Sequence, residues 1–550
     1  MKRKKGARSA GGQNEGYAPS DRITLPIVGL VTLVLVAYWN SLDGGFHFDD
    51  QGIFLDPYVM GPGFGWRILR IMQTRPLTFL TFHWNYIGNG ANGWGFHLVD
   101  LLLHLLSSVL LFFIAGTLLP RFLAWFAAAL FAVHPLQTQA VNYVFERATL
   151  LATLFALLSL YLFLKARYPW SVAAFGLSLL AKEETIALPA FLLLYAVLAN
   201  LPRGARRCCV LMSGLSALAA ARLFYVLRST PDARLGFGTQ GVSVISYGLT
   251  QCRVIWIYVR FLVLPIGLSL EHDVKLSRNV WSPPATLPAM LLLALSIGTL
   301  AWMAWRRNAP ALWMLGFFIL LSPSSSIVPA SDLIFEHRTY LPMACLAVAV
   351  ALLLSRFRPP PPFLPLTLLL AMLLAATMAQ NRVWHDERSL WTDAIEKSPY
   401  KALGYFHLGQ AYASSDPARA RELYEKGLKL DPVNAAGQTN LGLILLSQGH
   451  PETAVQHFQE ALRDGGENTL VWNNIGVAEL RLGHIEEAIR SFRHALQSEP
   501  CRFDARYNLV HTLSYRGEKD NALLAARIPV DCHLLPEQVL KLEDSVRALR

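Results

Sequence analysis

Two adjacent carboxylates, Asp49 and Asp50, follow the first long apolar run of the chain, in the connection 42–95. Neighbouring side chains of a connection point in different directions. One carboxylate can therefore take the proton of an attacking hydroxyl while the other orients a residue or an ion. The alternative is an acidic turn at a membrane surface. The pair predicts a general base and leaves open which of the two residues it is.

Further acids, bases and cations stand in later connections of the chain. Arg75 precedes Pro76 and an aromatic run, where its guanidinium either clamps a phosphate by paired hydrogen bonds or is an interfacial arginine beside aromatic residues. The other candidates are His134, Glu146, Arg147, Lys182, Glu183, Glu336, His337 and Arg338. Each alone fits an ordinary interfacial ion pair. Because they come from separate connections on one expected side of a membrane, we predict that they converge on a donor-phosphate or substrate site.

A third polar set lies on one expected helix face, at His97, Asp100 and His104. The spacing of three and then four residues places them along one stripe. Two histidines flanking a carboxylate can bind a metal, but the rest of the sequence supplies no clear further ligand. We expect a structural polar seam and no metal site.

The composition indicates what must position these side chains. Of 550 residues, 53% are hydrophobic and 16% charged, with a mean hydropathy of +0.35, which is too apolar for a soluble multidomain protein. Residues 1–380 hold 29 basic and 15 acidic side chains (+14), and residues 381–550 hold 20 and 23 (−3). Six cysteines without a CxxC pair exclude a disulfide scaffold and a zinc ribbon. The basic residues end apolar runs and form no patch, which argues against nucleic-acid binding.

We therefore expect an all-α protein, with a polytopic membrane bundle over 23–380. A basic tail, 1–22, precedes it. Eleven apolar runs predict spans near 23–40, 96–118, 122–139, 148–166, 169–181, 185–200, 208–227, 285–305, 310–327, 339–355 and 362–380. With a cytoplasmic N-terminus, every second connection is then basic and free of acids, as the positive-inside rule requires. An odd count places residues 381–550 outside the cytoplasm.

One more apolar stretch, 246–266, is not expected to span. It carries Gln251, Arg253 and Arg260. A charge at the bilayer centre costs about 3 kcal/mol or more, so an amphipathic helix at the membrane surface is the cheaper arrangement.

The soluble part, 381–550, is repetitive. Its alanines recur every 34 residues, at Ala420, Ala454, Ala488 and Ala522. Leu-Gly or Ile-Gly pairs and aromatic residues recur around the first three. This is the period and pattern of tetratricopeptide repeats, which form an α-solenoid. We place the repeats at about 400–432, 433–466, 467–500 and 501–534, the last one degenerate.

Taken in order, these motifs resemble the polytopic GT-C glycosyltransferases. Among them they are most similar to the transmembrane-and-TPR-containing protein O-mannosyltransferases and their bacterial relatives. The residues that carry the resemblance are Phe48-Asp49-Asp50, Arg75-Pro76-Leu77-Thr78, Gly95-Phe96-His97-Leu98-Val99 with His104, Ala132-Val133-His134-Pro135, Glu146-Arg147, Leu180-Ala181-Lys182-Glu183, and Glu336-His337-Arg338 with Tyr340-Leu341-Pro342.

The resemblance implies an inverting transfer of a mannose-like hexose from a polyprenyl-phosphate sugar to a Ser or Thr hydroxyl, without a cofactor or an essential metal. Asp49 or Asp50 would be the base. Cations from the set Arg75, Arg147, Lys182 and Arg338 would stabilise the departing phosphate. We expect the repeats to engage an acceptor protein. We also expect a bacterial inner membrane with periplasmic repeats, the alternative being an endoplasmic reticulum membrane with lumenal repeats.

Two other functions remain open from the sequence. A membrane-anchored TPR scaffold that recruits proteins gives no reason for charged groups to gather on one membrane side. An O-antigen-ligase-like enzyme also uses lipid-linked glycans, but it would depend on an Arg/His pair in a large loop and not on an acidic pair after the first span.

Overall fold

The computed structural model describes residues 21–54, 57–61, 65–72, 74–229, 242–325, 328–329, 332–358, 362–465, 468–529, 532 and 536–547. The chain divides into two compact units. The first contains residues 1–270 and 274–386, and the second residues 271–273 and 387–550. The expected basic tail falls almost wholly outside the described residues.

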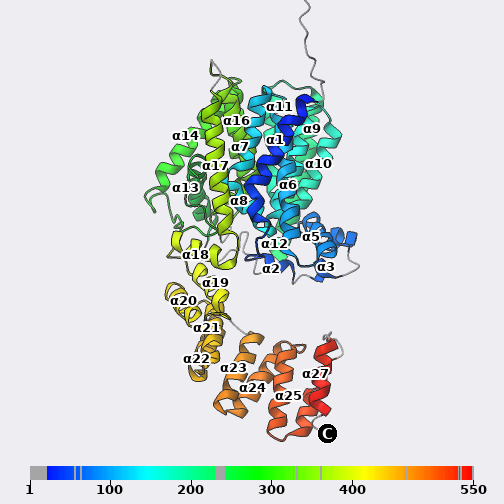
Figure 1. Ribbon diagram of the computed structural model, residues 1–550, viewed down its shortest axis with the longest axis vertical. Coiled ribbons are helices and arrows are strands. Elements are labelled where there is room, and N and C mark those ends of the chain that lie inside the picture. The colour runs from blue at the N-terminus through cyan, green and yellow to red at the C-terminus, as the bar shows by residue number, and fades with distance from the viewer. Residues whose placement is uncertain are drawn as a thin grey trace, which may run out of the picture. The chain divides into compact units, whose positions relative to one another are not determined.

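The first unit is a helical bundle (Figure 1). Its helices are α1 Asp21–Tyr38, α2 Asp50–Ile53, α3 Pro57–Met60, α4 Ile68–Ile71, α5 Pro76–Asn89, α6 Gly93–Ala115, α7 Arg121–Val133, α8 Thr138–Asn142, α9 Arg147–Leu164, α10 Tyr168–Ala181, α11 Leu188–Leu198, α12 Arg203–Ser229, α13 Val244–Val263, α14 Thr286–Trp305, α15 Ala309–Leu321, α16 Tyr340–Leu354 and α17 Phe363–Val383. Single 3₁₀ turns lie at Trp39–Ser41, Gly65–Arg67, Pro135–Gln137, Val144–Glu146, Glu183–Ala187 and Glu336–Thr339.

Every one of the eleven expected spans falls on a helix. In the described part of the chain, seven helices are long and apolar enough to cross a bilayer by length and composition. The other four, α7, α10, α11 and α15, have 13, 14, 11 and 13 residues. A 13-residue helix is about 20 Å long, short of the roughly 30 Å hydrocarbon core. The all-α membrane fold is confirmed, and the count of eleven crossings stays a prediction.

Small side chains let the bundle helices approach closely. On α7, Ala124, Ala127, Ala128, Ala129 and Ala132 are all buried, and this helix contacts α1, α6, α16 and α17. Within a bilayer, such small side chains let helix backbones approach closely, and van der Waals packing then holds the helices together. The interior around α7 therefore fixes the ends of several helices at once.

The stretch expected as an amphipathic helix is helical, as α13. Its buried face carries Val254, Tyr258 and Phe261, which pack in one apolar cluster with Leu136 and Phe317. Gln251 is also buried and donates to the carbonyl of Leu333 at 2.7 Å. The helix therefore belongs to the first unit and holds the segment before α16.

The connection 42–95 is built from short helices. It contains α2 to α5, which lie at one end of the bundle, the end to which α1 runs from residue 21 (Figure 1). An apolar cluster of Ile53, Val59, Phe82, Phe96 and Val144 joins this connection to the starts of α6 and α9. The acidic pair is thus anchored on a packed layer.

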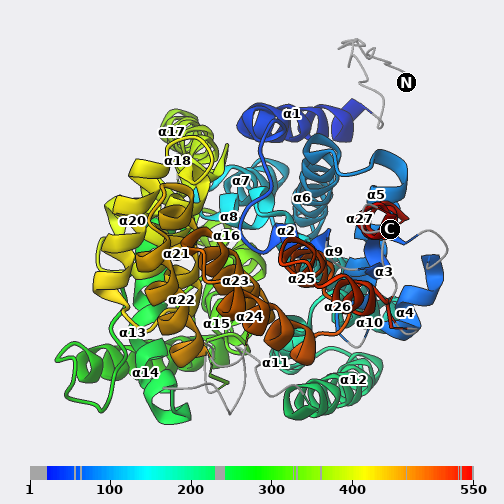
Figure 2. The ribbon, with the colours of Figure 1, turned by 90° about the horizontal axis from the view of Figure 1, so that it is seen from below.

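The second unit consists of helix pairs (Figures 1 and 2). Its helices are α18 Glu387–Lys397, α19 Ala402–Tyr412, α20 Pro417–Leu430, α21 Ala435–Ser447, α22 Pro451–Gly465, α23 Thr469–Leu482, α24 Ile485–Ser498, α25 Phe503–Tyr515, α26 Lys519–Ala525 and α27 Pro536–Arg547. Close packing explains the recurring glycine. A Cβ at Gly442 would lie 2.5 Å from the ring of Phe458, and one at Gly476 would lie 2.5 Å from the ring of Phe492.

A disulfide joins Cys501 to Cys532, 31 residues apart. It ties the segment before α25 to the segment before α27. This pairing has no signature in the sequence, because the two cysteines are far apart in the chain and have no recognisable spacing. The other cysteines, Cys208, Cys209, Cys252 and Cys345, are free thiols.

Candidate active site

A cleft of about 330 Å³ in the first unit gathers charged side chains from several connections. Its charged and titratable lining residues are Asp49, Arg75, Tyr143, Glu146, Lys182, Glu183, Glu184, Tyr247, Asp332, His337 and Arg338. The rest of the lining is mainly apolar and aromatic. Seven of the eleven site residues expected from the sequence therefore line one cavity: Asp49, Arg75, Glu146, Lys182, Glu183, His337 and Arg338.

The fold separates the two adjacent aspartates. Asp49 is exposed and lines the cleft, whereas Asp50 is fully buried and does not. One oxygen of Asp50 accepts the N–H of His47 at 2.9 Å, and the other accepts the N–H of Phe145 at 2.7 Å. Burial raises the pKa of Asp50 to about 7, although both backbone hydrogen bonds and the nearby His47 act in the opposite direction. Asp50 positions the turn, and Asp49 is the member of the pair that lines the cleft.

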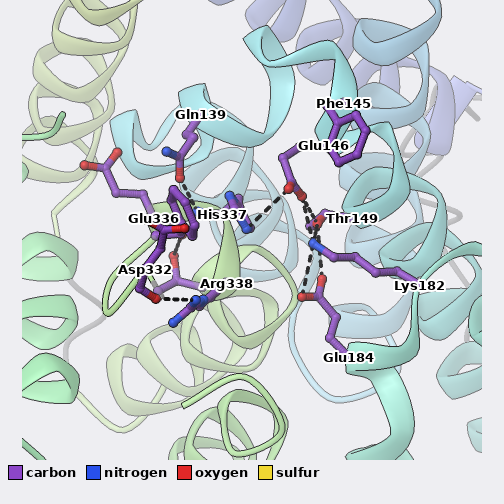
Figure 3. Close-up of polar contacts among 12 residues, drawn as sticks. Gln139, Phe145, Glu146, Thr149, Lys182, Glu184, Asp332, Glu336, His337 and Arg338 are labelled. Atoms are coloured by element: carbon purple, nitrogen blue, oxygen red, sulfur yellow. Dashed lines mark hydrogen bonds and ion pairs between the residues drawn. The ribbon is translucent and has the colours of Figure 1, made fainter. Parts of the chain in front are cut away.

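Lys182 lies at the centre of a buried polar cluster (Figure 3). Its Nζ donates to Glu146 Oε2 at 2.8 Å and to Thr149 Oγ1 at 2.7 Å, and it lies 3.4 Å from Glu184 Oε2. The Thr149 hydroxyl lies 2.5 Å from Glu146 Oε2. Burial raises the pKa of Glu184, an effect that the neighbouring Lys182 partly offsets. The cluster joins the start of α9 to the end of α10.

His337 and Arg338 enter the cleft from the 3₁₀ turn before α16 (Figure 3). His337 Nε2 lies 3.4 Å from Glu146 Oε1, and its backbone N–H donates to Gln139 Oε1 at 2.8 Å. Arg338 donates to the Tyr247 hydroxyl at 3.2 Å and to the carbonyl of Asp332 at 2.9 Å. The turn thereby adds a cation and an imidazole to the same cavity.

Arg75 adopts a strained backbone at the edge of the cleft. Its φ of +51° is in the left-handed region, which costs a non-glycine residue about 1–2 kcal/mol. Its Nη2 donates to Glu183 Oε1 at 3.1 Å. Burial acts to raise the pKa of Glu183, but the charge and hydrogen bond of Arg75 bring it below its ordinary value. The guanidinium is therefore held in place by an ionised partner.

Four expected site residues do not line this cleft. Arg147 is fully buried, lies 2.5 Å from Asp100 through its Nε and donates to the carbonyl of Phe96 at 3.0 Å. Glu336 accepts the N–H of Ser269 at 2.7 Å, and the His134 ring accepts the N–H of Leu136 at 3.2 Å. Asp50 accepts the N–H groups of His47 and Phe145. Buried charges need such partners, so the structure places these residues as supports of the site and not at its surface.

The polar seam on α6 is also internal. Asp100 pairs with Arg147, and His104 lies 2.7 Å from the Tyr340 hydroxyl and 3.0 Å from the carbonyl of Ala132. Among the described residues, no three His, Cys, Asp or Glu side chains gather in a way that would hold a metal ion. These contacts connect α6 to α7, α9 and α16.

Four charged or titratable cleft residues were not among the expected site residues: Tyr143, Glu184, Tyr247 and Asp332. Glu184 directly follows Lys182 and Glu183, a signal that was available in the sequence. Tyr143 precedes Glu146 by three residues. Tyr247 lies on α13, a helix expected at the membrane surface, and no local pattern indicates that it contributes to the cleft.

An apolar groove of about 560 Å³ adjoins the cleft. It lies between α10 and α12, which contact each other and lie on the same side of the unit in Figure 2. Arg75, Glu183 and Leu223 line both cavities. Leucine, alanine and glycine residues make up most of the remaining lining, together with Thr74, Pro76 and a second cation, Arg222.

Comparison with known protein families agrees with this architecture. Residues 79–225 match the family model described as dolichyl-phosphate-mannose-protein mannosyltransferase. Residues 391–469 and 470–500 match tetratricopeptide repeat models.

The curated relatives include three proteins named as protein O-mannosyl-transferases. F38B6.6 of Caenorhabditis elegans is 26% identical over 73% of this chain and 62% of its own length. TMTC3 of Homo sapiens is 32% identical over 32% of this chain and 21% of its own length. TMTC1 of Homo sapiens is 25% identical over 78% of this chain and 57% of its own length. The chain thus covers less than two thirds of each relative. The chain is similar to the dolichyl-phosphate-mannose-protein mannosyltransferase family model over residues 79–225 and to tetratricopeptide repeats over 391–500, and the resemblance expected from its motifs is confirmed.

Proposed function

We propose that the protein is a membrane O-mannosyltransferase that moves a mannose-like hexose from a polyprenyl-phosphate carrier to a Ser or Thr hydroxyl of a protein. The supporting observation is the cleft that places the Asp49 carboxylate with Arg75, Lys182 and Arg338 beside an apolar groove. The carboxylate would act on the attacking hydroxyl, and the cations would act on the departing phosphate. The relatives' names support the class of acceptor and sugar.

The chemistry follows from these positions. Asp49 takes the proton of the attacking hydroxyl as its oxygen forms a bond to the anomeric carbon. The bond from that carbon to the phosphate oxygen breaks, and the electron pair leaves with the polyprenyl phosphate. Attack from the face opposite the phosphate inverts the anomeric centre. Arg75 and Arg338 favour the departure because their charges stabilise the phosphate in a partly enclosed site.

The apolar groove between α10 and α12 suits the hydrocarbon chain of this donor. Arg75 is common to both cavities, so a phosphate bound there leaves the sugar in the cleft and the prenyl units in the groove. Because the bilayer is as apolar as the groove, van der Waals packing against the groove, and not removal from water, would favour binding of the chain. Arg75 would then bind the phosphate at the point where the sugar site and the lipid groove join.

Transfer assays with membranes and a panel of polyprenyl-phosphate sugars test the proposal. We expect transfer from a mannosyl donor to a Ser/Thr acceptor, and release of polyprenyl phosphate. No turnover with any polyprenyl-phosphate sugar, by a chain that is folded and inserted, would leave the scaffold function in its place.

Filling the groove should weaken donor binding. Gly176 lines it, and a Cβ there meets nothing within 4 Å. We expect Gly176→Leu to raise the KM for a long-chain donor about tenfold, because the larger side chain occupies the space of the prenyl units and such overpacking typically costs about 1–3 kcal/mol, with little change for a donor shortened to a few prenyl units. Gly214→Leu is the matched control, because Gly214 on α12 is exposed, open and outside the groove. Equal KM changes in both variants would contradict a lipid role for the groove.

The second unit is proposed to lie on the non-cytoplasmic side of the membrane. Disulfides persist in oxidising compartments and are rare in the cytosol, and the second unit contains Cys501–Cys532. We expect mass spectrometry without reduction to recover this cross-linked pair, and protease added to the non-cytoplasmic face of sealed membranes to cleave the repeats. Cleavage from the cytoplasmic face alone would contradict the eleven-span topology.

A further inference from the structure

The cleft carries more carboxyl groups than cations, although the proposed donor is an anion. Its described lining includes three cations and five carboxyl groups, which are Arg75, Lys182 and Arg338, and Asp49, Glu146, Glu183, Glu184 and Asp332. Opposite charges attract and like charges repel, so cations alone would bind a phosphate more tightly than this mixture does. The carboxyl groups therefore serve some purpose other than affinity for the phosphate.

Glu183 is the carboxyl group beside the proposed phosphate ligand. Glu146 and Glu184 surround the Lys182 ammonium at 2.8 and 3.4 Å, as a buried cation requires. Glu183 has a different neighbour, because its Oε1 accepts from Arg75 Nη2 at 3.1 Å. The side chains of Arg75 and Glu183 are 24% and 22% exposed, and both line the cleft and the apolar groove. Glu183 thus adjoins the phosphate position at the junction of the two cavities.

The carboxylate of Glu183 is fixed in position and in charge. In its 3₁₀ turn, the Thr185 hydroxyl accepts from Ser178 of α10 at 2.8 Å. The Ile186 carbonyl accepts from Ser216 of α12 at 2.9 Å. Burial acts to raise the pKa of Glu183, but the charge and hydrogen bond of its arginine partner bring it below its ordinary value, so the group is ionised at neutral pH. A negative charge therefore stays near any phosphate that binds the arginine.

Transfer of the sugar changes the charge of that phosphate. The proposed donor is a phosphodiester with one negative charge. The hydroxyl proton goes to Asp49, the electron pair of the broken bond stays on the phosphate oxygen, and the lipid becomes a phosphate monoester. Such a monoester carries a charge of about −1.5 to −2 at pH 7. Because the Coulomb energy is proportional to charge, Glu183 repels the product up to about twice as strongly as the donor.

We propose that Glu183 is a specificity-determining residue that makes the site prefer the phosphodiester donor to the phosphate monoester product, and thereby promotes product release. The inference rests on the proposed function for the nature of donor and product. Arg75 supplies an attraction that both lipids share. Glu183 weakens that attraction in proportion to the charge on the phosphate, so a site without this carboxylate would retain its product.

Binding of three lipids to the full-length chain in nanodiscs tests the inference. The probes are a polyprenyl phosphate, its methyl phosphodiester and its mannosyl phosphodiester, all of one chain length. The methyl ester has the charge of the donor without its sugar. We expect Glu183→Gln to tighten binding of both phosphodiesters about threefold and of the monoester about tenfold. The second factor is roughly the square of the first, because the repulsion that is removed nearly doubles with the charge.

Three further variants separate charge from other effects. Glu183→Ala also removes the charge, without adding an amide donor, and should give the same unequal tightening. Glu183→Asp keeps the charge and should keep the wild-type preference for phosphodiesters. Asp43→Asn is the matched control, because Asp43 is exposed and outside the cleft, and it should bind all three probes as the wild type does. Binding of the methyl phosphodiester shows that each variant is folded.

Product inhibition gives a second measurement. Added polyprenyl phosphate should inhibit transfer by the Glu183→Gln chain at a concentration about tenfold lower than it inhibits the wild type, in line with its tighter binding. A merely structural role of Glu183 would alter the binding of monoester and phosphodiester alike.

Equal tightening of all three probes in both neutral variants, or no tightening at all, would overturn the inference, and so would absence of binding of every probe to the wild type. Failure of the proposed function gives a different pattern, in which binding depends on charge as expected but no sugar reaches a Ser/Thr acceptor. Transfer of sugar together with charge-independent binding would keep the proposed function and remove the role of Glu183.

Discussion

Asp49→Asn is expected to lower the rate of sugar transfer about 10²–10⁴-fold, the usual contribution of a general base. A Ser or Thr hydroxyl is a poor nucleophile, and Asp49 is the member of the acidic pair that lines the cleft. Asparagine keeps the size and polarity but cannot accept the proton. Single-turnover transfer from a mannosyl donor measures the effect, with donor binding measured separately. We expect donor affinity to change far less than the rate.

Two neighbouring aspartates make this test specific. Asp43 is exposed in the same connection and does not line the cleft, so Asp43→Asn should transfer sugar at close to the wild-type rate. Asp50→Asn replaces one acceptor oxygen by an N–H donor opposite the N–H of His47 or Phe145. Leaving such a buried group unpaired costs about 1–3 kcal/mol, so this variant should lose stability as well as activity. Near-wild-type transfer by Asp49→Asn would refute the mechanism proposed here.

Arg147→Met is expected to destabilise the first unit by about 3–5 kcal/mol, because it leaves the fully buried Asp100 carboxylate without its partner. The guanidinium also lies over the rings of Phe82 and Phe96, 4.7 and 5.2 Å from their centroids. Thermal unfolding in nanodiscs measures the loss. The size of the effect comes from burial, since the same pair at a surface would contribute little.

A double substitution tests whether Arg147 is a support or a phosphate ligand. Replacing both members of a buried ion pair by apolar residues is often neutral, so Arg147→Met with Asp100→Leu should recover most of the stability and retain transfer. Arg338→Met is the comparison, because Arg338 lines the cleft. It should reduce transfer without a matching loss of stability. A stable double variant without activity would place Arg147 in the chemistry.

Much of the architecture follows from local sequence patterns. Apolar runs predict where helices occur because a bilayer or a bundle core accepts only segments whose backbone is satisfied internally, and each of the eleven expected runs is helical. The 34-residue recurrence of alanine and of Leu-Gly pairs predicts helix pairs because the small residues permit close approach, as the Gly442–Phe458 packing demonstrates. The family resemblance rests on short ordered motifs such as Phe48-Asp49-Asp50 and Glu336-His337-Arg338.

The roles within the site depend on contacts between distant segments. Asp49 and Asp50 have the same chemistry in the sequence. In the fold, Asp50 is buried and accepts the N–H groups of His47 and Phe145, the second of which comes from a distant segment, whereas Asp49 is exposed. From the sequence, Arg147 and Lys182 are equal candidates for the cation that binds phosphate. In the structure, Arg147 is buried against Asp100, whereas Lys182 lines the cleft.

The sequence by itself determined the helices, the repeats and the set of charged candidates, because these depend on residue type and short spacing. Only the tertiary structure decided which candidates share a cavity, that Tyr247 of α13 joins them, and that Cys501 meets Cys532. The physical reason is that burial and hydrogen-bond partners are set by residues far apart in the chain. A local sequence pattern does not indicate which distant residues come into contact.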